Sequence, residues 1–162
     1  MSTTIEASKE DILKLYKSSD KKAKQHMEKI YGREVFIGNI TDHLKSFQDA
    51  CKINKTTAAE VLPYHKPKNV KQVYLNTVAM LAEIAEALQE NFEADYADSN
   101  QQKWYAWFEW DKRLSRFVFV LSDYRYTHTR AGSGSRFAFE TEKKADYFGK
   151  QFIDLHNKAL TY

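Results

Sequence analysis

Apolar residues recur every three to four positions through the first half of the chain, which is the spacing of one face of an α-helix. This pattern predicts a pair of helices over residues 8–31, interrupted at residues 18–20, the second of which ends at Gly32. It also predicts a third helix from about Thr41 and a short helical turn after Thr57. Glu60 follows Thr57 at the spacing of a capping box, which favours a helix start at that point.

The longest apolar stripe predicts a helix from about Pro67 to about Glu90. Proline suits the first turn of a helix, because the N–H that it lacks would have no intrahelical partner there. The buried side of this helix is expected to carry Val70, Val73, Tyr74, Thr77, Met80, Leu81, Ile84, Ala85 and Leu88. A stripe this wide is typical of a helix at the centre of a fold.

Aromatic and β-branched residues alternate with polar ones in the next part of the chain. WYAWFEW (104–110) and SRFVFVL (115–121) are predicted strands, and the few residues between them have the length of a hairpin loop. RYTHT (125–129) and RFAFE (136–140) are expected to add a third and a fourth strand. Thr141 is a candidate N-cap of a last helix.

Helices followed by antiparallel strands and a closing helix predict an α+β fold. The expected parts are a helical part (1–92), an aromatic antiparallel β-meander of three to four strands (102–140) and a C-terminal helix (141–160) packed on the sheet. With 162 residues, of which 43% are hydrophobic, the chain has enough apolar side chains for one core, so we expect a single domain over 1–162.

Charge, cysteine content and the absence of long apolar runs indicate which partners and which cell compartment to expect. The net charge of +3 is too small to indicate a nucleic-acid partner by itself. A single cysteine, Cys51, excludes an internal disulfide, and no apolar run approaches the roughly 18 residues of a membrane span. The N-terminus, MSTTIEASKED, is too polar for a signal peptide, so we expect a cytoplasmic protein with no membrane partner.

Local signatures of catalysis are missing from the sequence. No GxSxG elbow, P-loop or glycine-rich dinucleotide motif is present, and Cys51 has no CxxC partner. No two histidines have the spacing of a metal site; they are His26, His43, His65, His128 and His156. We therefore expect no enzyme, no metal site and no cofactor.

A basic segment between the predicted strands is the main candidate site. Five of the six arginines lie within 24 residues, at Arg113, Arg116, Arg125, Arg130 and Arg136. Guanidinium groups beside a glycine-serine loop with free backbone N–H groups suit a phosphate or a carboxylate. The candidate ligand-binding residues are Arg125, His128, Arg130, Ser133, Ser135 and Arg136, with Trp104, Tyr105 and Trp107 as stacking partners. The alternative is that the glycine-serine segment is only a turn.

Two further interpretations stay open. Large rings on both faces of strand 104–110 provide either a stacking platform for a base or an interface between subunits, because aromatic residues serve both purposes. The helices over 8–31 resemble a helix-turn-helix with a lysine-rich second helix, although base-reading Asn, Gln or Arg residues are lacking there. Nucleic-acid binding by these helices is therefore the weaker alternative.

Three stretches of the chain resemble a family of small uncharacterised proteins of phages and integrated mobile elements of gut anaerobic bacteria. The stretches are ITDHLKSFQDAC (40–51), LAEIAEALQENFEADYADSNQQKWYAWFEW (81–110) and GSGSRFAFETEKKADYFGKQFIDLHNKAL (132–160). The most specific pieces are the GSR triplet that ends at Arg136 and the GKQF sequence from Gly149. The chain departs from the family pattern at Phe92, Ala94 and Ala106.

The resemblance implies a shared fold and an accessory protein of a phage or mobile element, but it implies no activity. Combined with the residues above, it favours a non-enzymatic binding module for a nucleotide-like or nucleic-acid anion, which forms a homo-oligomer and sequesters a host-defence signal in the host cell cytoplasm. The alternative is a structural or virion-associated protein whose aromatic sheet is the oligomer interface.

Overall fold

The computed structural model describes residues 8–32, 34–125 and 137–161, and it divides the chain into two compact units, Met1–Asp42 and His43–Tyr162. Each unit is described by itself. The expectation of one domain over 1–162 stays a prediction.

The N-terminal unit contains the two predicted helices, α1 (Lys9–Ser18) and α2 (Lys21–Tyr31), followed by the short α3 (Glu34–Ile37). Side chains cap both starts, since Ser8 Oγ accepts the amide of the third helical residue of α1 at 3.2 Å and Asp20 does the same for α2 at 2.8 Å. The α1 and α2 predictions are thus confirmed.

The helices α4 (Ile40–His43) and α5 (Phe47–Asn54) replace the single helix that was predicted from Thr41. The prediction was wrong in its continuity, because Ser46 adopts an extended conformation and its hydroxyl caps α5 by accepting the Asp49 amide at 3.2 Å. The predicted capping box is confirmed at the start of α6 (Ala58–Val61).

The central helix is α7 (Val70–Gln89), close to its predicted bounds. It begins after Asn69 because that side chain accepts the Gln72 amide at 3.0 Å, so Pro67 stands outside the helix rather than in its first turn. The predicted last helix is divided at Phe152 into α8 (Glu142–Gln151) and α9 (Ile153–Leu160). Both short helices contact the hairpin.

The sheet is a long antiparallel hairpin of β1 (Lys103–Asp111) and β2 (Arg116–Arg125). Its register shifts between Trp107, opposite Leu121, and Phe108, opposite Phe119, so Val120 is the extra residue of a β-bulge. Because of this extra residue, the inward-facing positions of β2 change from odd numbers before the bulge to even numbers after it. Both halves of β2 therefore turn the same face of the hairpin toward α8 and α9.

The described residues confirm α+β but not the number of strands. β2 continues to Arg125, four residues beyond the predicted end, and residues 126–129 of the predicted third strand lie outside the described residues. In the described part of the predicted fourth strand, only Phe139 pairs with the sheet, through an isolated bridge to Trp104. A meander of three to four strands is thus a prediction that goes beyond this two-stranded sheet.

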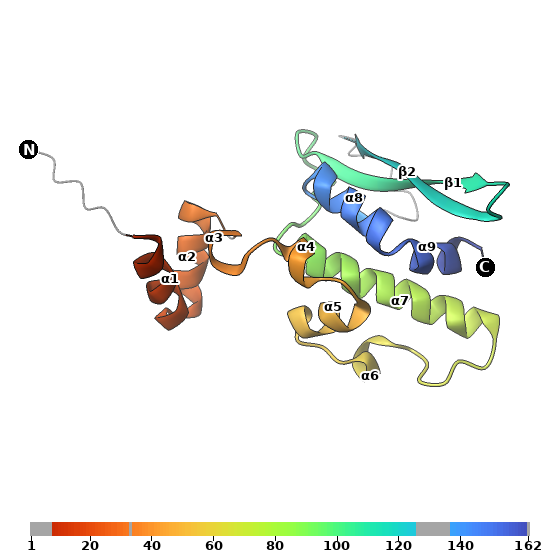
Figure 1. Cartoon of the computed structure of the whole chain (residues 1–162), viewed down its shortest axis with the longest axis horizontal. Helices are drawn as coiled ribbons and strands as arrows, with labels where there is room; N and C mark the ends of the chain where they lie inside the picture. Colours follow the sequence, from red (N-terminus) through yellow and green to blue (C-terminus); the bar gives the residue numbers. More distant parts are fainter. Residues whose placement is uncertain (1–7, 33, 126–136, 162) are drawn as a thin grey trace, which may run out of the picture. The chain divides into compact units, whose positions relative to one another are not determined.

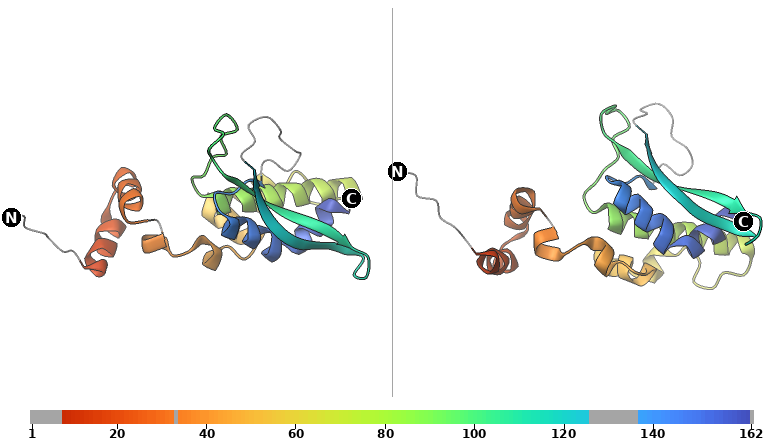
Figure 2. Two further views of the ribbon diagram at one scale, coloured as in Figure 1. Left: turned by 90° about the horizontal axis from the view of Figure 1, so that it is seen from above. Right: turned by 45° about the horizontal axis from the view of Figure 1, so that its top comes forward.

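The second unit is layered in the order hairpin, α8 and α9, α7, then α5 and α6 (Figure 1). The views in Figure 2 show α8 and α9 running beneath the hairpin, as predicted for the C-terminal part. Its core consists of Leu44, Phe47, Ala50, Leu81, Ile84, Leu88, Ala138, Phe139, Ala145, Phe148 and Phe152. In the described part of the chain, no helix has the length and apolar content of a membrane span.

Candidate functional site

The predicted ligand-binding segment is anchored at both ends to the start of β1. On one side Arg125, the last residue of β2, pairs with Lys103. On the other side Phe139 and Trp104 exchange two backbone hydrogen bonds of 2.9 Å each. The chain therefore leaves β2 beside Lys103, on one edge of β1, and returns beside Trp104, on the opposite edge.

Most candidate residues of that segment lie outside the described residues, namely His128, Arg130, Ser133, Ser135 and Arg136. For Arg125 the structure describes the backbone alone. Their assignment to a ligand stays a prediction, while the positions of both ends of the segment are known.

The three candidate stacking residues do not share one face of the hairpin. Trp104 lies on the inner face with Ala106, and its ring centroid is 4.9 Å from that of Tyr124. Tyr105 and Trp107 alternate with them and therefore lie on the outer face. A single planar base can therefore stack on one of these sets and not on both.

Sequence analysis missed a cluster that supports Tyr105. Lys103 is fully buried, and its Nζ donates to the carbonyl oxygens of Asp98 at 3.1 Å and Gln101 at 2.9 Å. The same ammonium lies 5.7 Å from the ring centroid of Tyr96, whose hydroxyl is 3.4 Å from the Tyr105 hydroxyl. Burial raises the pKa of Tyr105, so this phenol stays protonated.

Lys103 gives this end of the hairpin a rigid support. Its buried charge is compensated by carbonyl dipoles and a ring face, which hold the connector 95–102 against β1. A lysine at the start of a strand is ordinarily exposed, so its type gives no sign of burial. The one available sequence signal was strand alternation, which places Lys103 on the same face as Tyr105 and Trp107.

The outer face of the hairpin exposes a patch of large apolar side chains. Trp107 and the cross-strand Leu121 are 46% and 49% exposed, and the bulged Val120 is 42% exposed. Trp110 is also exposed, but by alternation it lies on the inner face near the hairpin tip and is not part of this patch. Such a group of neighbouring apolar residues is typical of an interaction surface rather than of an inert surface.

His156 is the one buried histidine among the described residues, and its surroundings are apolar. Its ring centroid lies 4.4 Å from that of Phe108 and 4.7 Å from that of Phe148. Burial lowers its pKa to about 4, and a hydrogen bond to the Phe148 backbone offsets part of this effect. Nε2 has no hydrogen-bond partner in the described part of the chain. This environment indicates a neutral core residue.

Within the described ranges, no group of three or more His, Cys, Asp or Glu side chains is placed to hold a metal ion. The expectation of a non-enzymatic protein without a cofactor stays a prediction.

The basic N-terminal helices show side-chain packing rather than an array directed to a groove. Lys24 Nζ lies 5.5 Å from the ring centroid of Tyr16, so this lysine packs on α1. Tyr16 also donates a hydrogen bond to Glu28 and stacks on Phe36 at 4.3 Å. DNA binding by α2 stays a prediction that no described contact favours.

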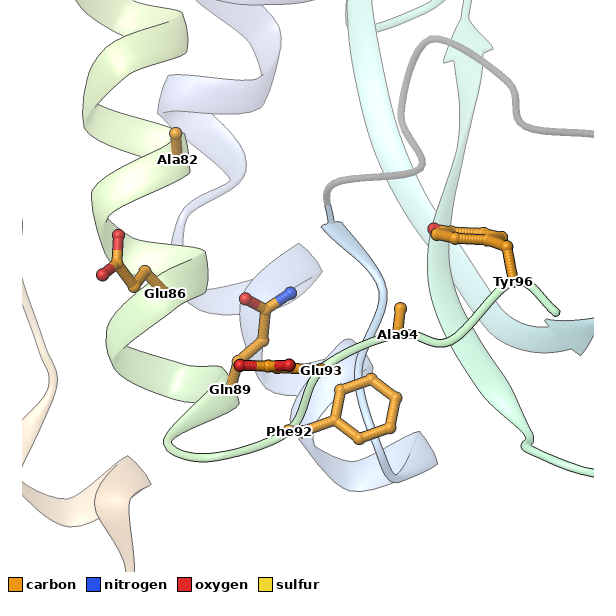
Figure 3. Close-up of a pocket in the computed structure, with 7 residues that line it drawn as sticks. All are labelled: Ala82, Glu86, Gln89, Phe92, Glu93, Ala94 and Tyr96. Atoms are coloured by element: carbon orange, nitrogen blue, oxygen red, sulfur yellow. The ribbon is translucent and has the colours of Figure 1, made fainter. Parts of the chain in front are cut away.

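A separate hollow of about 420 Å³ lies between the end of α7 and the chain that follows it. Figure 3 shows that α7 supplies one wall and residues 92–96 supply the other. The lining residues are Ala82, Glu86, Gln89, Phe92, Glu93, Ala94 and Tyr96. None of them was among the predicted site residues.

Comparisons with known proteins found no matching family model, no matching curated protein and no matching solved structure. Functional proposals for this chain therefore depend on its own residues and geometry.

Proposed function

We propose that this chain is a non-enzymatic binding module that holds an anionic ligand with the segment from Arg125 to Arg136, beside the first residues of β1. The observation that carries the proposal is the double anchoring of this segment, through the Arg125–Lys103 pair and the Phe139–Trp104 bridge. An arginine-rich segment with two fixed ends binds a ligand at a smaller cost in conformational entropy than a free tail.

The ligand class follows from the residues that the anchoring brings together. Arginine side chains and glycine-serine amides are donors suited to phosphate oxygens. Aromatic rings flank the root of the segment, with Trp104 and Tyr124 on the inner face and Tyr96 and Tyr105 on the outer face. A nucleotide-like ligand uses both kinds of group, since its phosphate needs donors and its base needs a ring.

The proposed biological role is that of a phage or mobile-element accessory protein in the host cell cytoplasm, which sequesters a nucleotide-like defence signal. The sequence resemblance supports the origin, and the arginine-rich segment supports the ligand class. The third and fourth strands expected over 125–129 and 136–140, which would complete a meander of three to four strands, belong to the same proposal.

Removing two arginines should separate ligand binding from folding. We expect Arg130→Ala with Arg136→Ala to weaken binding of ATP at least tenfold, because each charge-assisted hydrogen bond contributes roughly 1.5–3 kcal/mol. Isothermal titration calorimetry measures the affinity, and a single-stranded oligonucleotide titrated at several salt concentrations tests the nucleic-acid alternative, whose affinity must fall steeply with salt.

A matched control is available at the other end of the hairpin. Arg113→Ala with Arg116→Ala removes the same charge near the tip, where Arg113 makes only a 3.9 Å ion pair with Asp111. This control should keep the wild-type affinity for ATP. Equal losses in both double variants would show a general charge effect and contradict a site at the segment.

The second candidate function is a structural protein that self-associates through the outer face of the hairpin. The exposed patch of Trp107, Val120 and Leu121 favours it, because monomeric proteins seldom expose neighbouring large apolar side chains without a function. This candidate includes the virion-associated alternative.

A charged residue in the patch should abolish self-association. We expect Leu121→Arg to convert an oligomer of the wild-type chain into a monomer with unchanged circular dichroism, because a buried unpaired charge at an interface is strongly unfavourable. Light scattering coupled to size-exclusion chromatography measures the mass. The control is Val70→Arg, which places the same charge at an exposed apolar residue of α7. A wild-type chain that elutes with the mass of a monomer would contradict the interface.

A further inference from the structure

We propose that the hollow between α7 and residues 92–96 is a second binding site, for a small organic cation that carries an ammonium group on an apolar body. The site shares no residue with the segment from Arg125 to Arg136 and takes the opposite charge. Its volume of about 420 Å³ falls in the size range of small-molecule sites.

The walls of the hollow combine two kinds of surface. Phe92 and Tyr96 present rings, and Ala82 and Ala94 present methyl groups, which leave the space between helix and returning chain open (Figure 3). Gln89 is held in the wall because its Nε2 donates to the Ala138 carbonyl oxygen at 2.7 Å. These side chains suit the apolar body of a ligand.

The polar part of the lining is acidic. Glu86 stands at the rim on α7, and Glu93 comes from the chain that follows the helix (Figure 3). Within the described residues, neither carboxylate has a hydrogen bond or an ion pair, unlike Glu90, which pairs with Lys144 Nζ at 2.7 Å. Both side chains are exposed, so an ammonium group in the hollow would pair with carboxylates that are otherwise solvated.

The surrounding sequence strengthens the negative potential. Between Lys71 and Lys103 the chain has no lysine, arginine or histidine, but it has six acidic residues, Glu83, Glu86, Glu90, Glu93, Asp95 and Asp98. Four of them are paired or hydrogen bonded within the fold. Glu90 pairs with a lysine, Glu83 accepts from Asn54 at 3.0 Å, and Asp95 and Asp98 each accept a backbone amide at 2.8 Å. The remaining field attracts cations and repels anions.

An organic cation fits this lining better than a metal ion. Metal sites with hard cations need several oxygen ligands that converge on one point, whereas this hollow has two carboxylates among rings and methyl groups. Aromatic rings beside carboxylates are the surroundings that ammonium groups on apolar bodies find favourable.

The test uses phenethylammonium as the probe and the whole chain labelled with ¹⁵N. We expect saturable shifts of the backbone amide signals of residues 82–96, weaker binding at high salt, and no such shifts with the neutral analogue 2-phenylethanol. Glu86→Gln with Glu93→Gln should weaken the binding by up to about tenfold, since two exposed charge contacts contribute on the order of 1 kcal/mol together.

The matched control is Glu142→Gln, which removes one exposed carboxylate from the start of α8 and should leave the affinity unchanged. Equal binding of 2-phenylethanol would overturn the cation assignment. Unchanged affinity in the double variant, or shifts spread over the whole surface, would overturn the site itself. None of these results depends on ATP binding, so failure here is distinguishable from failure of the proposed function.

Discussion

Gly149→Leu should lower the free energy of unfolding of the second unit by about 3 kcal/mol, the upper part of the usual range for overpacking a core. Gly149 is buried in α8 where the helix crosses the hairpin. A Cβ at this position would overlap the ring of Phe119, with Cε2 at 2.7 Å, and would lie 3.0 Å from the Ala106 Cβ. Even one methyl group therefore forces the ring or the helix to move.

Alanine at the same position gives a sharper version of the test. In an open helix Gly→Ala stabilises by roughly 0.5–1 kcal/mol, so a loss of stability in Gly149→Ala reverses the ordinary sign. Adding Phe119→Leu should recover part of the loss, because it removes ring atoms that the methyl group meets. Urea unfolding followed by tryptophan fluorescence measures the second unit, since all three tryptophans are in β1.

The control for helix propensity is Lys143→Ala, an exposed change in the same helix that should alter stability by no more than about 0.5 kcal/mol. If Gly149→Ala were as stable as the wild type without Phe119→Leu, α8 would not lie as close to the hairpin as the structure places it.

Acid should destabilise the second unit through His156, by about 3 kcal/mol between pH 6.5 and pH 4. The pKa of His156 is lowered from 6.5 to about 4, chiefly by burial, so the unfolded chain binds the proton more tightly than the folded chain. The contribution is therefore fully present above pH 6.5 and is lost as the pH falls through the folded pKa. Urea midpoints measured at several pH values give the slope.

His156→Leu should remove this pH dependence and leave stability at pH 7 close to that of the wild type. The leucine keeps an apolar side chain between Phe108 and Phe148 and removes a buried Nε2 that has no partner among the described residues. His65→Leu, a change at an exposed histidine, is the control and should keep the wild-type slope.

The pKa of Asp49 is lowered from 3.8, chiefly by the hydrogen bond from Ser46, so this carboxylate adds little to the slope between pH 6.5 and pH 4. An unchanged slope between pH 6.5 and pH 4 in His156→Leu would show that the histidine is not buried in the neutral form.

Local pattern was sufficient for the elements that have strong periodicity or a local cap. The stripe that reaches Leu88 specifies α7, although Val70 and Val73, which were expected on its buried side, are exposed. Thr57 with Glu60 specifies the start of α6, because a capping box acts within a few residues. Alternating rings likewise indicated a hairpin with β1 close to its observed bounds. The same patterns did not reveal the bulge at Val120 in β2 or the break at Phe152 between α8 and α9.

Composition and short-range spacing are enough to predict the α+β class, the order of the elements, rings on both faces of β1 and an arginine-rich segment next to the aromatic strands. Three features became visible only in the folded chain: both ends of that segment meet β1, Lys103 is buried, and Glu86 and Glu93 line one hollow. These features depend on contacts between residues distant along the chain or on the path of the backbone, which local pattern does not encode.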